Sequence, residues 1–400
     1  IHKIIEIRNC GKFLKYNPSE TAYKWNGIFS SINTIYAENG SGKTTFTQIL
    51  KSLSGNSCEL VEKRKSLMAC DPIKISVIDD HRKQYVFSIN DWSEYMPYIE
   101  VYDNYYSESN VYVVSLGNYD TPSNFYDIVP DGYTICDKIC ISRRKRRNCS
   151  VAIRNIRHDL SEMKGTRAQK KRLNRLNSQI ARKEKLSASI KDLENTLNRK
   201  ITEVENLYVE KANNYLNRFN PNLRIKKANK QGHQLVYHIS INNVDLRSDS
   251  TNISLKHSLS EGDKSSLSLS FFLARLELLP NLEKRIIVFD DPISSFDTRR
   301  RIMTISLLSR VAEKSAQFFL LSHDLNFVKE FSDRHYNPTN LKIVWLNGSS
   351  VFVKHDLKLE TMTGISKDMY TLQNYLHAGA MSDFEKRVVI RCVRRVIEGI

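Results

Sequence analysis

The sequence predicts an α/β fold whose two globular lobes are separated by an antiparallel coiled coil. Residues 32–36 form an apolar, strand-like run that leads through a glycine-rich turn into a helical pattern at 44–53. A second apolar run, at 286–289, ends in two consecutive aspartates. Between these runs, apolar residues recur at three- and four-residue spacings from 153 to 204, which is typical of a coiled coil.

The composition is that of an ordinary globular protein. Of the 400 residues, 40% are hydrophobic and 26% are charged, and no apolar run approaches the roughly eighteen residues that a membrane helix needs. There is no export signal, so we expect a cytoplasmic protein without a membrane partner. Seven cysteines without a CxxC pair favour reduced thiols over a zinc site. Because the chain begins at Ile1 and stops inside an expected helix, we expect a partial sequence.

The net charge of +17 is concentrated in one segment. Residues 138–200 contain 20 Lys and Arg against 5 Asp and Glu, which leaves only +2 for the rest of the chain. The heptad pattern breaks at Gly165, so we expect two helices that fold back on each other, with two ordinary helices as the alternative. The first arm spans about 25 residues, or roughly 35–40 Å, and we expect the other arm to be longer.

The excess of one charge sign on this hairpin needs a partner of opposite charge. A phosphate backbone in DNA, RNA or tRNA is the expected partner, with an acidic protein surface or a solvated face as alternatives. The expected contacts begin the basic segment: Arg143, Arg144, Lys145, Arg146 and Arg147.

The glycine-rich turn matches a P-loop. Its sequence, AENGSGKT from Ala37 to Thr44, follows a strand and opens a helix, so backbone N–H groups and the helix dipole would hold phosphates. Lys43 would reach the β- and γ-phosphates of ATP, and the Thr44 hydroxyl would bind Mg²⁺. The strict pattern has glycine where this chain has Ala37. The predicted ATP-binding residues are Asn39, Gly40, Ser41, Gly42, Lys43, Thr44 and Thr45.

The aspartate pair after the apolar run at 286–289 resembles a Walker B motif. Asp290 would hold the Mg²⁺ ion and Asp291 would polarise the attacking water. Glu is usual at the second position, and Asp is one methylene shorter. A buried strand with a capping aspartate pair before Pro292 is the alternative interpretation.

A signature-like motif, LSEGDK at 259–264, precedes a helix of small and apolar residues. Ser260 and the backbone of Gly262 would donate hydrogen bonds to a γ-phosphate. The alternative is that Ser260 caps the helix and the acids that follow stabilise its first turn.

Two further motifs follow the aspartate pair in order. SSFD at 294–297 lies where a D-loop belongs, and His323 ends the next apolar run, where it would contact the γ-phosphate. The glutamine expected after the strand at 98–102 is absent, and Asp103 or Asn110 is the best substitute.

Together these motifs resemble the ABC/SMC/Rad50 class of ATPases. In that class the signature acts on ATP held by a second copy, so the resemblance implies a homodimer or higher oligomer with ATP sandwiched between copies. More narrowly, the strings IYAENGSGKTT, IEVYDNYYSESNVY, LSEGDKSSLSLSFFLARL, FDDPISSFD and LLSHD are similar to those of bacterial anticodon-nuclease-related ATPases and of the ATPase subunit of the Septu anti-phage system. This narrower resemblance covers residues 1–137 and 220–398.

The resemblance implies an ATPase of phage defence that controls a separate nuclease. A self-contained tRNA-cleaving nuclease is one alternative, because such members use an Arg-x-x-x-Glu pair and Arg394 and Glu398 have that spacing. An i,i+4 ion pair on a solvated helix is the simpler interpretation of those two residues. A DNA-repair clamp without its own nuclease is the other alternative. The expected domains are ATPase lobes at 1–137 and 220–345, the basic hairpin at 138–219 and a helical region at 346–400.

Overall fold

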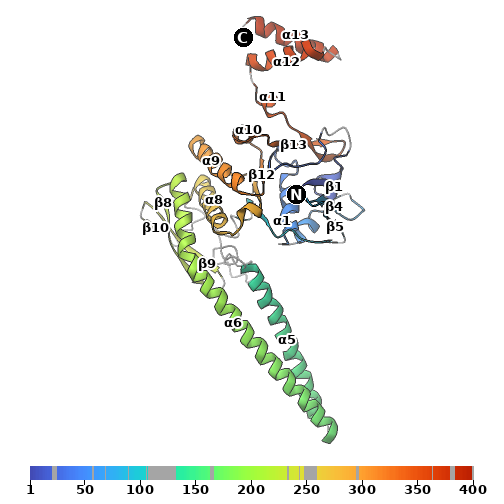
Figure 1. Cartoon of the computed structure of the whole chain (residues 1–400), viewed down its shortest axis with the longest axis vertical. Coiled ribbons are helices and arrows are strands. Elements are labelled where there is room, and N and C mark those ends of the chain that lie inside the picture. The colour runs from blue at the N-terminus through green and yellow to red at the C-terminus, as the bar shows by residue number, and fades with distance from the viewer. Residues whose placement is uncertain are drawn as a thin grey trace. The chain divides into compact units, whose positions relative to one another are not determined.

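The computed structural model forms two compact units. The first consists of Ile1–Asn104 with Asn281–Ile400, and the second of Tyr105–Pro280 (Figure 1). The domain limits expected at 137, 219 and 345 stay predictions. The structure describes residues 1–19, 25–55, 58–67, 69–88, 90–104, 106, 132–162, 166–231, 234–242, 244–246, 259–293, 297–362, 364–378 and 383–398.

A six-stranded sheet of order β14-β13-β3-β12-β11-β7 lies in the first unit. Neighbours from β13 to β7 run parallel. Parallel strands that are covered on both faces need continuous apolar runs, and Phe318 to Leu321 are all buried. Because parallel strands end at one edge, the residues that follow β3, β11 and β12 meet there. The strands are β3 (Ile32–Tyr36), β7 (Ile99–Tyr102), β11 (Ile286–Asp290), β12 (Gln317–Ser322), β13 (Thr339–Leu346) and β14 (Ser349–Lys354).

Three helices follow strands of this sheet. They are α1 (Lys43–Leu53), α9 (Thr298–Lys314) and α10 (Leu325–Ser332). Two begin at aspartate N-caps: Asp297 accepts from the Arg300 N–H at 2.8 Å, and Asp324 accepts from the Phe327 N–H at 3.0 Å. Such caps satisfy N–H groups that the helix itself leaves open.

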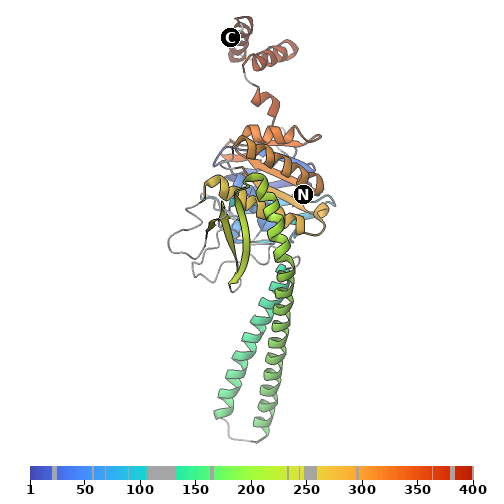
Figure 2. The ribbon, with the colours of Figure 1, turned by 90° about the vertical axis from the view of Figure 1, so that its left-hand side faces the viewer.

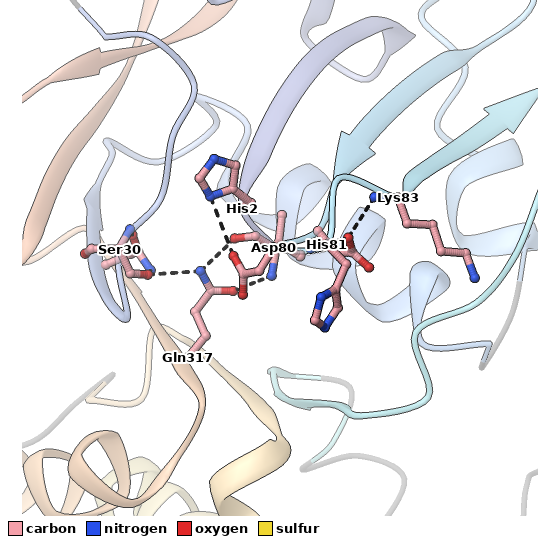
Figure 3. A network of polar contacts seen from close by, with 9 residues as sticks. His2, Ser30, Asp80, His81, Lys83 and Gln317 are labelled. Carbon is pink, nitrogen blue, oxygen red and sulfur yellow. Dashed lines mark hydrogen bonds and ion pairs between the residues drawn. The ribbon is translucent and has the colours of Figure 1, made fainter.

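An antiparallel sheet of order β2-β1-β4-β5-β6 shares a core with the parallel one. The ring of Phe352 lies 5.4 Å from that of Phe13 and 5.0 Å from that of Phe46. Gln317 adds a polar tie, because its Nε2 donates to the carbonyls of Ile1 and Ser30 at 2.8 and 2.9 Å (Figure 3). The elements here are β1 (Lys3–Cys10), β2 (Phe13–Tyr16), α2 (Glu59–Glu62), β4 (Lys74–Ile78), β5 (Gln84–Ser88) and β6 (Asp91–Trp92).

The expected antiparallel hairpin is confirmed in the second unit, where α5 (Gly132–Glu162) and α6 (Thr166–Phe219) lie side by side (Figure 2). Its seam contains the predicted heptad residues Ile153, Ile156 and Leu176. Two ion pairs cross between the arms, Arg143–Glu194 at 2.7 Å and Arg172–Asp159 at 2.6 Å.

The greater length of the second arm has a structural reason. Helix α6 has 54 residues against 31 in α5, and its last turns pack on α8 (Glu261–Leu278). Tyr208 Oη donates to the Phe271 carbonyl at 3.2 Å, and Lys211 pairs with Glu277 at 2.5 Å. A small sheet of order β10-β9-β8 follows α6, formed by β8 (Leu223–Gln231), β9 (Gln234–Ile241) and β10 (Val244–Leu246).

The region from 346 onward is not helical throughout, which corrects our expectation. Its first element is strand β14, which pairs with β13 across Asn347 and Gly348. Both residues have positive φ, 49° and 80°, and Asn-Gly flanked by apolar runs is the strongest short hairpin signal. Helices α11 (Leu357–Thr361), α12 (Gly364–Ala378) and α13 (Asp383–Glu398) then follow.

Among the described residues, no helix combines the length and the apolar character needed to span a membrane.

Candidate nucleotide-binding site

The P-loop lies between β3 and α1, as predicted. Its backbone turns through Gly40 and Gly42, whose φ angles of 75° and 119° favour glycine. Ala37 is not among the residues with positive φ, so the alanine needs no special backbone freedom there. The Ala37 N–H donates to the Ser322 carbonyl of β12 at 3.1 Å, which fixes the start of the loop beside the end of that strand.

The turn between β1 and β2 packs against the P-loop, which sequence reasoning missed. A β-carbon on Gly11 would lie 2.6 Å from Thr45 Oγ1, and one on Gly42 would lie 3.0 Å from the Phe13 ring. Between these contacts, Lys12 is exposed, and its Nζ lies 3.7 Å from the β-carbon position of Gly40. The Gly11–Phe13 turn therefore places a second lysine at the mouth of the loop.

Two serines at the start of β14 bind both the glycine-rich loop and the turn between β1 and β2. Ser350 Oγ donates to the Ser41 carbonyl at 2.7 Å, and the Ser350 N–H donates to the Lys12 carbonyl at 2.8 Å. Ser349 Oγ accepts from the Leu14 N–H at 3.0 Å. The Asn-Gly turn before them is a signal for the strand that carries these serines, but not for their contacts with the loop.

Lys43, Asp291 and His323 form one connected group. Lys43 is buried, and its Nζ donates to the Ala37 carbonyl at 2.8 Å and lies 3.3 Å from Asp291 Oδ2. The other carboxylate oxygen of Asp291 accepts from the His323 N–H at 2.9 Å and lies 2.8 Å from His323 Nδ1. A proton on Nδ1 donated to this oxygen leaves Nε2 as the free acceptor of the ring.

The backbone of Asp291 is set for these contacts. Its φ is 49°, in the left-handed region, and its N–H donates to the Leu321 carbonyl at 2.9 Å. Aspartate tolerates this conformation better than most residues. The alternative of a simple cap before Pro292 does not account for the paired lysine and histidine.

Asp290 suits a divalent cation. It ends β11, is buried, and lies between two parallel neighbours. Burial, reinforced by the charge of Asp291, raises the pKa of Asp290 to about 7. A cation would offset this cost, and a carboxylate together with the exposed hydroxyl-bearing residue Thr44 supplies the oxygen ligands that Mg²⁺ prefers. The predicted metal residues therefore fit Mg²⁺.

Asp103 follows β7, at the position where a glutamine was sought. Its buried carboxylate accepts from Gln48 Nε2 at 2.9 Å and pairs with Lys51 Nζ at 2.9 Å. Asp103 thus ties β7 to α1. Asn110 lies outside the described residues.

The signature-like serine caps α8. Ser260 Oγ accepts from the Asp263 N–H at 3.1 Å and donates to Asp263 Oδ2 at 2.6 Å. Asn220 donates to the other oxygen of Asp263 at 2.9 Å. Gly262 is buried in the first turn. Ser260 is therefore an N-cap of α8, as the alternative interpretation stated. Its role toward ATP held by a second copy stays a prediction.

The remaining predicted residues have simpler surroundings. Ser294, Ser295 and Phe296 of the expected D-loop lie outside the described residues. Arg394 Nε pairs with Glu398 Oε1 at 2.8 Å on an exposed face of α13, which is the i,i+4 ion pair that was the simpler interpretation.

The basic residues at the start of the hairpin differ in their surroundings. Arg143 is paired with Glu194, and Arg146 is half-buried. Arg144, Lys145 and Arg147 are exposed, and the part of α5 and α6 that the structure describes offers them no ion pair.

The comparison with protein families decides where this chain belongs. The model of AAA_13, an AAA domain, matches residues 138–376, which is more than half of the chain. The chain is a member of the AAA_13 family. The matched region contains α6, most of α5, Asp290, Asp291 and His323, and the glycine-rich loop at 37–44 precedes it. The predicted α/β fold with an antiparallel helical hairpin is confirmed for this AAA_13 chain.

Several solved structures are similar to this AAA_13 chain. The Smc head domain from Pyrococcus furiosus, with an extended coiled coil and bound to the C-terminal domain of ScpA, has a TM-score of 0.48 at 13% identity, covering 94% of this chain and 100% of that one. The Smc head with coiled coil and joint from Pyrococcus yayanosii has 0.44 at 10%, covering 90% and 98%. The recombination mediator RecF with ATP has 0.47 at 14%, covering 88% and 98%. No curated protein sequence matches.

Proposed function

We propose that this chain binds ATP with Mg²⁺ and hydrolyses it at a site shared between two copies. The AAA-domain family supports the ATPase class. The observation that carries the proposal is the connected group of Lys43, Asp291 and His323, which comes from three different segments at one edge of the sheet. A buried lysine on a P-loop and a carboxylate that also meets a histidine are the parts that phosphoryl transfer to water needs.

The contacts suggest an order of events. When ATP binds, Lys43 exchanges Asp291 for phosphate oxygens, and the carboxylate becomes available to polarise water. His323 stays bound to Asp291 through its N–H and Nδ1, which leaves its Nε2 free of Asp291. With a proton on Nε2 as well, the ring would donate a hydrogen bond to the γ-phosphate. Mg²⁺, when held by Thr44 and Asp290, neutralises phosphate charge.

The experiment is a comparison of Lys43→Ala with Lys15→Ala, which removes an exposed lysine of β2. Mg·ATP affinity and phosphate release are measured for both variants and the wild type. Lys43→Ala should lose about 100-fold in affinity, because a charged hydrogen-bond donor to phosphate is removed. The Lys15→Ala variant should behave as the wild type. Undiminished turnover in Lys43→Ala would refute the proposed site.

The biological role that we propose is control of a nuclease in anti-phage defence, with phosphate backbone bound along the hairpin. Its support is the motif resemblance and the exposure of Arg144, Lys145 and Arg147, for which the described residues of the hairpin provide no ion pair. Purification with its genomic neighbours tests the first part: an HNH-type nuclease that co-purifies supports it. A nuclease activity of the chain itself that is lost in Arg394→Ala supports the tRNA-cleaving alternative. Clamping of duplex DNA without cleavage supports the repair alternative.

A further inference from the structure

The last two helices of the chain expose an unusual amount of apolar surface. On α12 the exposed residues include Leu376, at 80%, and on α13 they include Ile390 and Ile397, at 67% and 78%. At 3.6 residues per turn, Ile390, Val393 and Ile397 fall within about 60° of one another on α13. All the exposed large apolar side chains described on the two helices are Ile365, Met369, Tyr375, Leu376, Ile390, Val393 and Ile397.

These apolar stripes are not the seam between the two helices. Helices α12 and α13 pack on each other through other residues, since Asp368 and Cys392 are buried and Arg395 Nη2 lies 2.8 Å from Asp368 Oδ1. An exposed apolar patch on a folded domain marks an interaction surface, and a helix with one apolar stripe normally buries it against another element.

The charges beside the α13 stripe indicate what covers it. Arg387, Arg391 and Arg394 are exposed on this side of the helix. The described acid among them, Glu398, is already paired with Arg394. A second copy would bring two such basic flanks together, which costs free energy because like charges repel. An acidic flank would complement them.

We propose that α12 and α13 form a docking surface for an amphipathic helix of a partner protein, with an apolar stripe flanked by Asp or Glu. Side chains of the partner cover Ile390, Val393 and Ile397, and its carboxylates meet Arg387 and Arg391. This is the helix-in-groove mode of recognition, in which apolar anchors give affinity and flanking charges give selectivity. The inference does not depend on ATP hydrolysis.

The test uses two synthetic helical peptides as probes, each of about three heptads with Leu at a and d. One carries Glu at the flanking positions and the other carries Lys. Fluorescence anisotropy with the full chain should show at least tenfold tighter binding of the Glu peptide. Ile390→Ser with Ile397→Ser should abolish that binding, and Arg387→Glu with Arg391→Glu should reverse the preference. Ile302→Ser, which removes an exposed isoleucine from α9, is the matched control and should bind as the wild type.

Each other outcome overturns the proposal. Equal affinity for both peptides, no binding of the Glu peptide, or binding that survives Ile390→Ser with Ile397→Ser excludes an acidic amphipathic partner. Sedimentation of the chain alone tests self-association: a dimer that these serines dissolve makes a second copy the occupant. Duplex DNA binding that needs Arg387 and Arg391 but not Ile390 and Ile397 makes nucleic acid the occupant. The substituted side chains are exposed, and unchanged thermal unfolding verifies that each variant is folded.

Discussion

The Nζ atom of Lys43 lies 3.3 Å from Oδ2 of Asp291, so the lysine that begins α1 and the aspartate that follows β11 are ion-paired. Each residue therefore neutralises the other. In the proposed mechanism Lys43 exchanges this carboxylate for phosphate oxygens, so phosphate binding by Lys43 would release Asp291.

The first prediction follows from this pair. Asp291→Asn removes the carboxylate that competes with phosphate for Lys43, so Mg·ATP affinity should stay the same or rise a fewfold. Hydrolysis should fall at least about 100-fold, in the range for loss of a general base, and an ATP-bound dimer should accumulate. Phosphate release and sedimentation velocity measure the two effects. Asp333→Asn, at an exposed aspartate paired with Lys329, is the control. Turnover of Asp291→Asn at the wild-type rate would show that another group activates the water.

The second prediction concerns sharing of the site between copies. Ser260→Arg places a bulky cation at the N-terminus of α8 and should leave ATP binding to each copy nearly unchanged while abolishing turnover. Mixing it with Lys43→Ala should restore at most one working site per dimer, which steady-state phosphate release detects. If the Ser260→Arg homodimer is fully active, Ser260 is only the helix cap that its contact with Asp263 shows.

The third prediction uses the raised pKa of Asp290, about 7. Protons compete with Mg²⁺ for this carboxylate below that pH, so the rise in Tm caused by Mg²⁺ should be larger at about pH 8 than at about pH 6. Without metal, the free energy of unfolding should instead fall as the pH rises. The folded-state pKa of Asp290 lies above the unfolded one, so its contribution to stability is lost between about pH 4 and about pH 7.

The control for this pH dependence is Asp290→Asn. It should remove the Mg²⁺-dependent shift in Tm at both pH values. An equal Mg²⁺ effect in the wild type at both pH values would mean that Asp290 does not bind the cation.

The fourth prediction concerns the Gly11–Phe13 turn. Gly11→Ala combines a positive φ of 56° with a β-carbon 2.6 Å from Thr45 Oγ1. Gly348→Ala is a matched control, because its φ is 80° but its β-carbon meets nothing within 4 Å. The control should lose about 1–2 kcal/mol of stability from backbone strain alone. Gly11→Ala should lose more and should also weaken ATP binding, measured by thermal unfolding and titration. Equal ATP affinity in the two variants would separate this turn from the nucleotide site.

The fifth prediction concerns the basic hairpin. Replacing Arg143, Arg144, Arg146 and Arg147 with Glu should weaken nucleic-acid binding by orders of magnitude and flatten its salt dependence, because fewer counterions are released. Basal ATP hydrolysis should survive. A control with four exposed basic residues of the other unit replaced by Glu has the same net charge: Lys284, Arg299, Lys354 and Lys358. Anisotropy at two salt concentrations that shows equal binding in both quadruple variants would assign the binding to net charge and not to the hairpin.

Local patterns were sufficient to predict the main elements. The strand-turn-helix context of Lys43 and the apolar run before Asp290 predicted the strands that the structure shows as β3 and β11. Heptad spacing predicted the seam at Ile153 and Ile156. These features depend on neighbours in sequence.

Contacts between distant segments could not be predicted in this way. Ser350 reaches Ser41 across 309 residues, and Asp103 reaches Lys51 across 52. Neither serine nor aspartate carries a spacing signal for such a contact, because the topology of the sheet brings them together. The expectation of helix from 346 onward was wrong for another reason: the Asn347-Gly348 turn favours a hairpin strand before the helical pattern begins.

Helix α6 connects the far end of the hairpin to the N-terminus of α8 through one continuous helix. Its 54 residues form a continuous rod of about 80 Å from the hairpin tip to Phe219. The next residue, Asn220, donates a hydrogen bond to Asp263, and Asp263 also accepts one from the hydroxyl of Ser260. Because a continuous helix is stiff, a displacement of its far end is transmitted along α6 to the contacts among Asn220, Asp263 and Ser260. A ligand bound near the far end of α6 could therefore act on Ser260, the residue for which we propose a role toward a second copy of the chain.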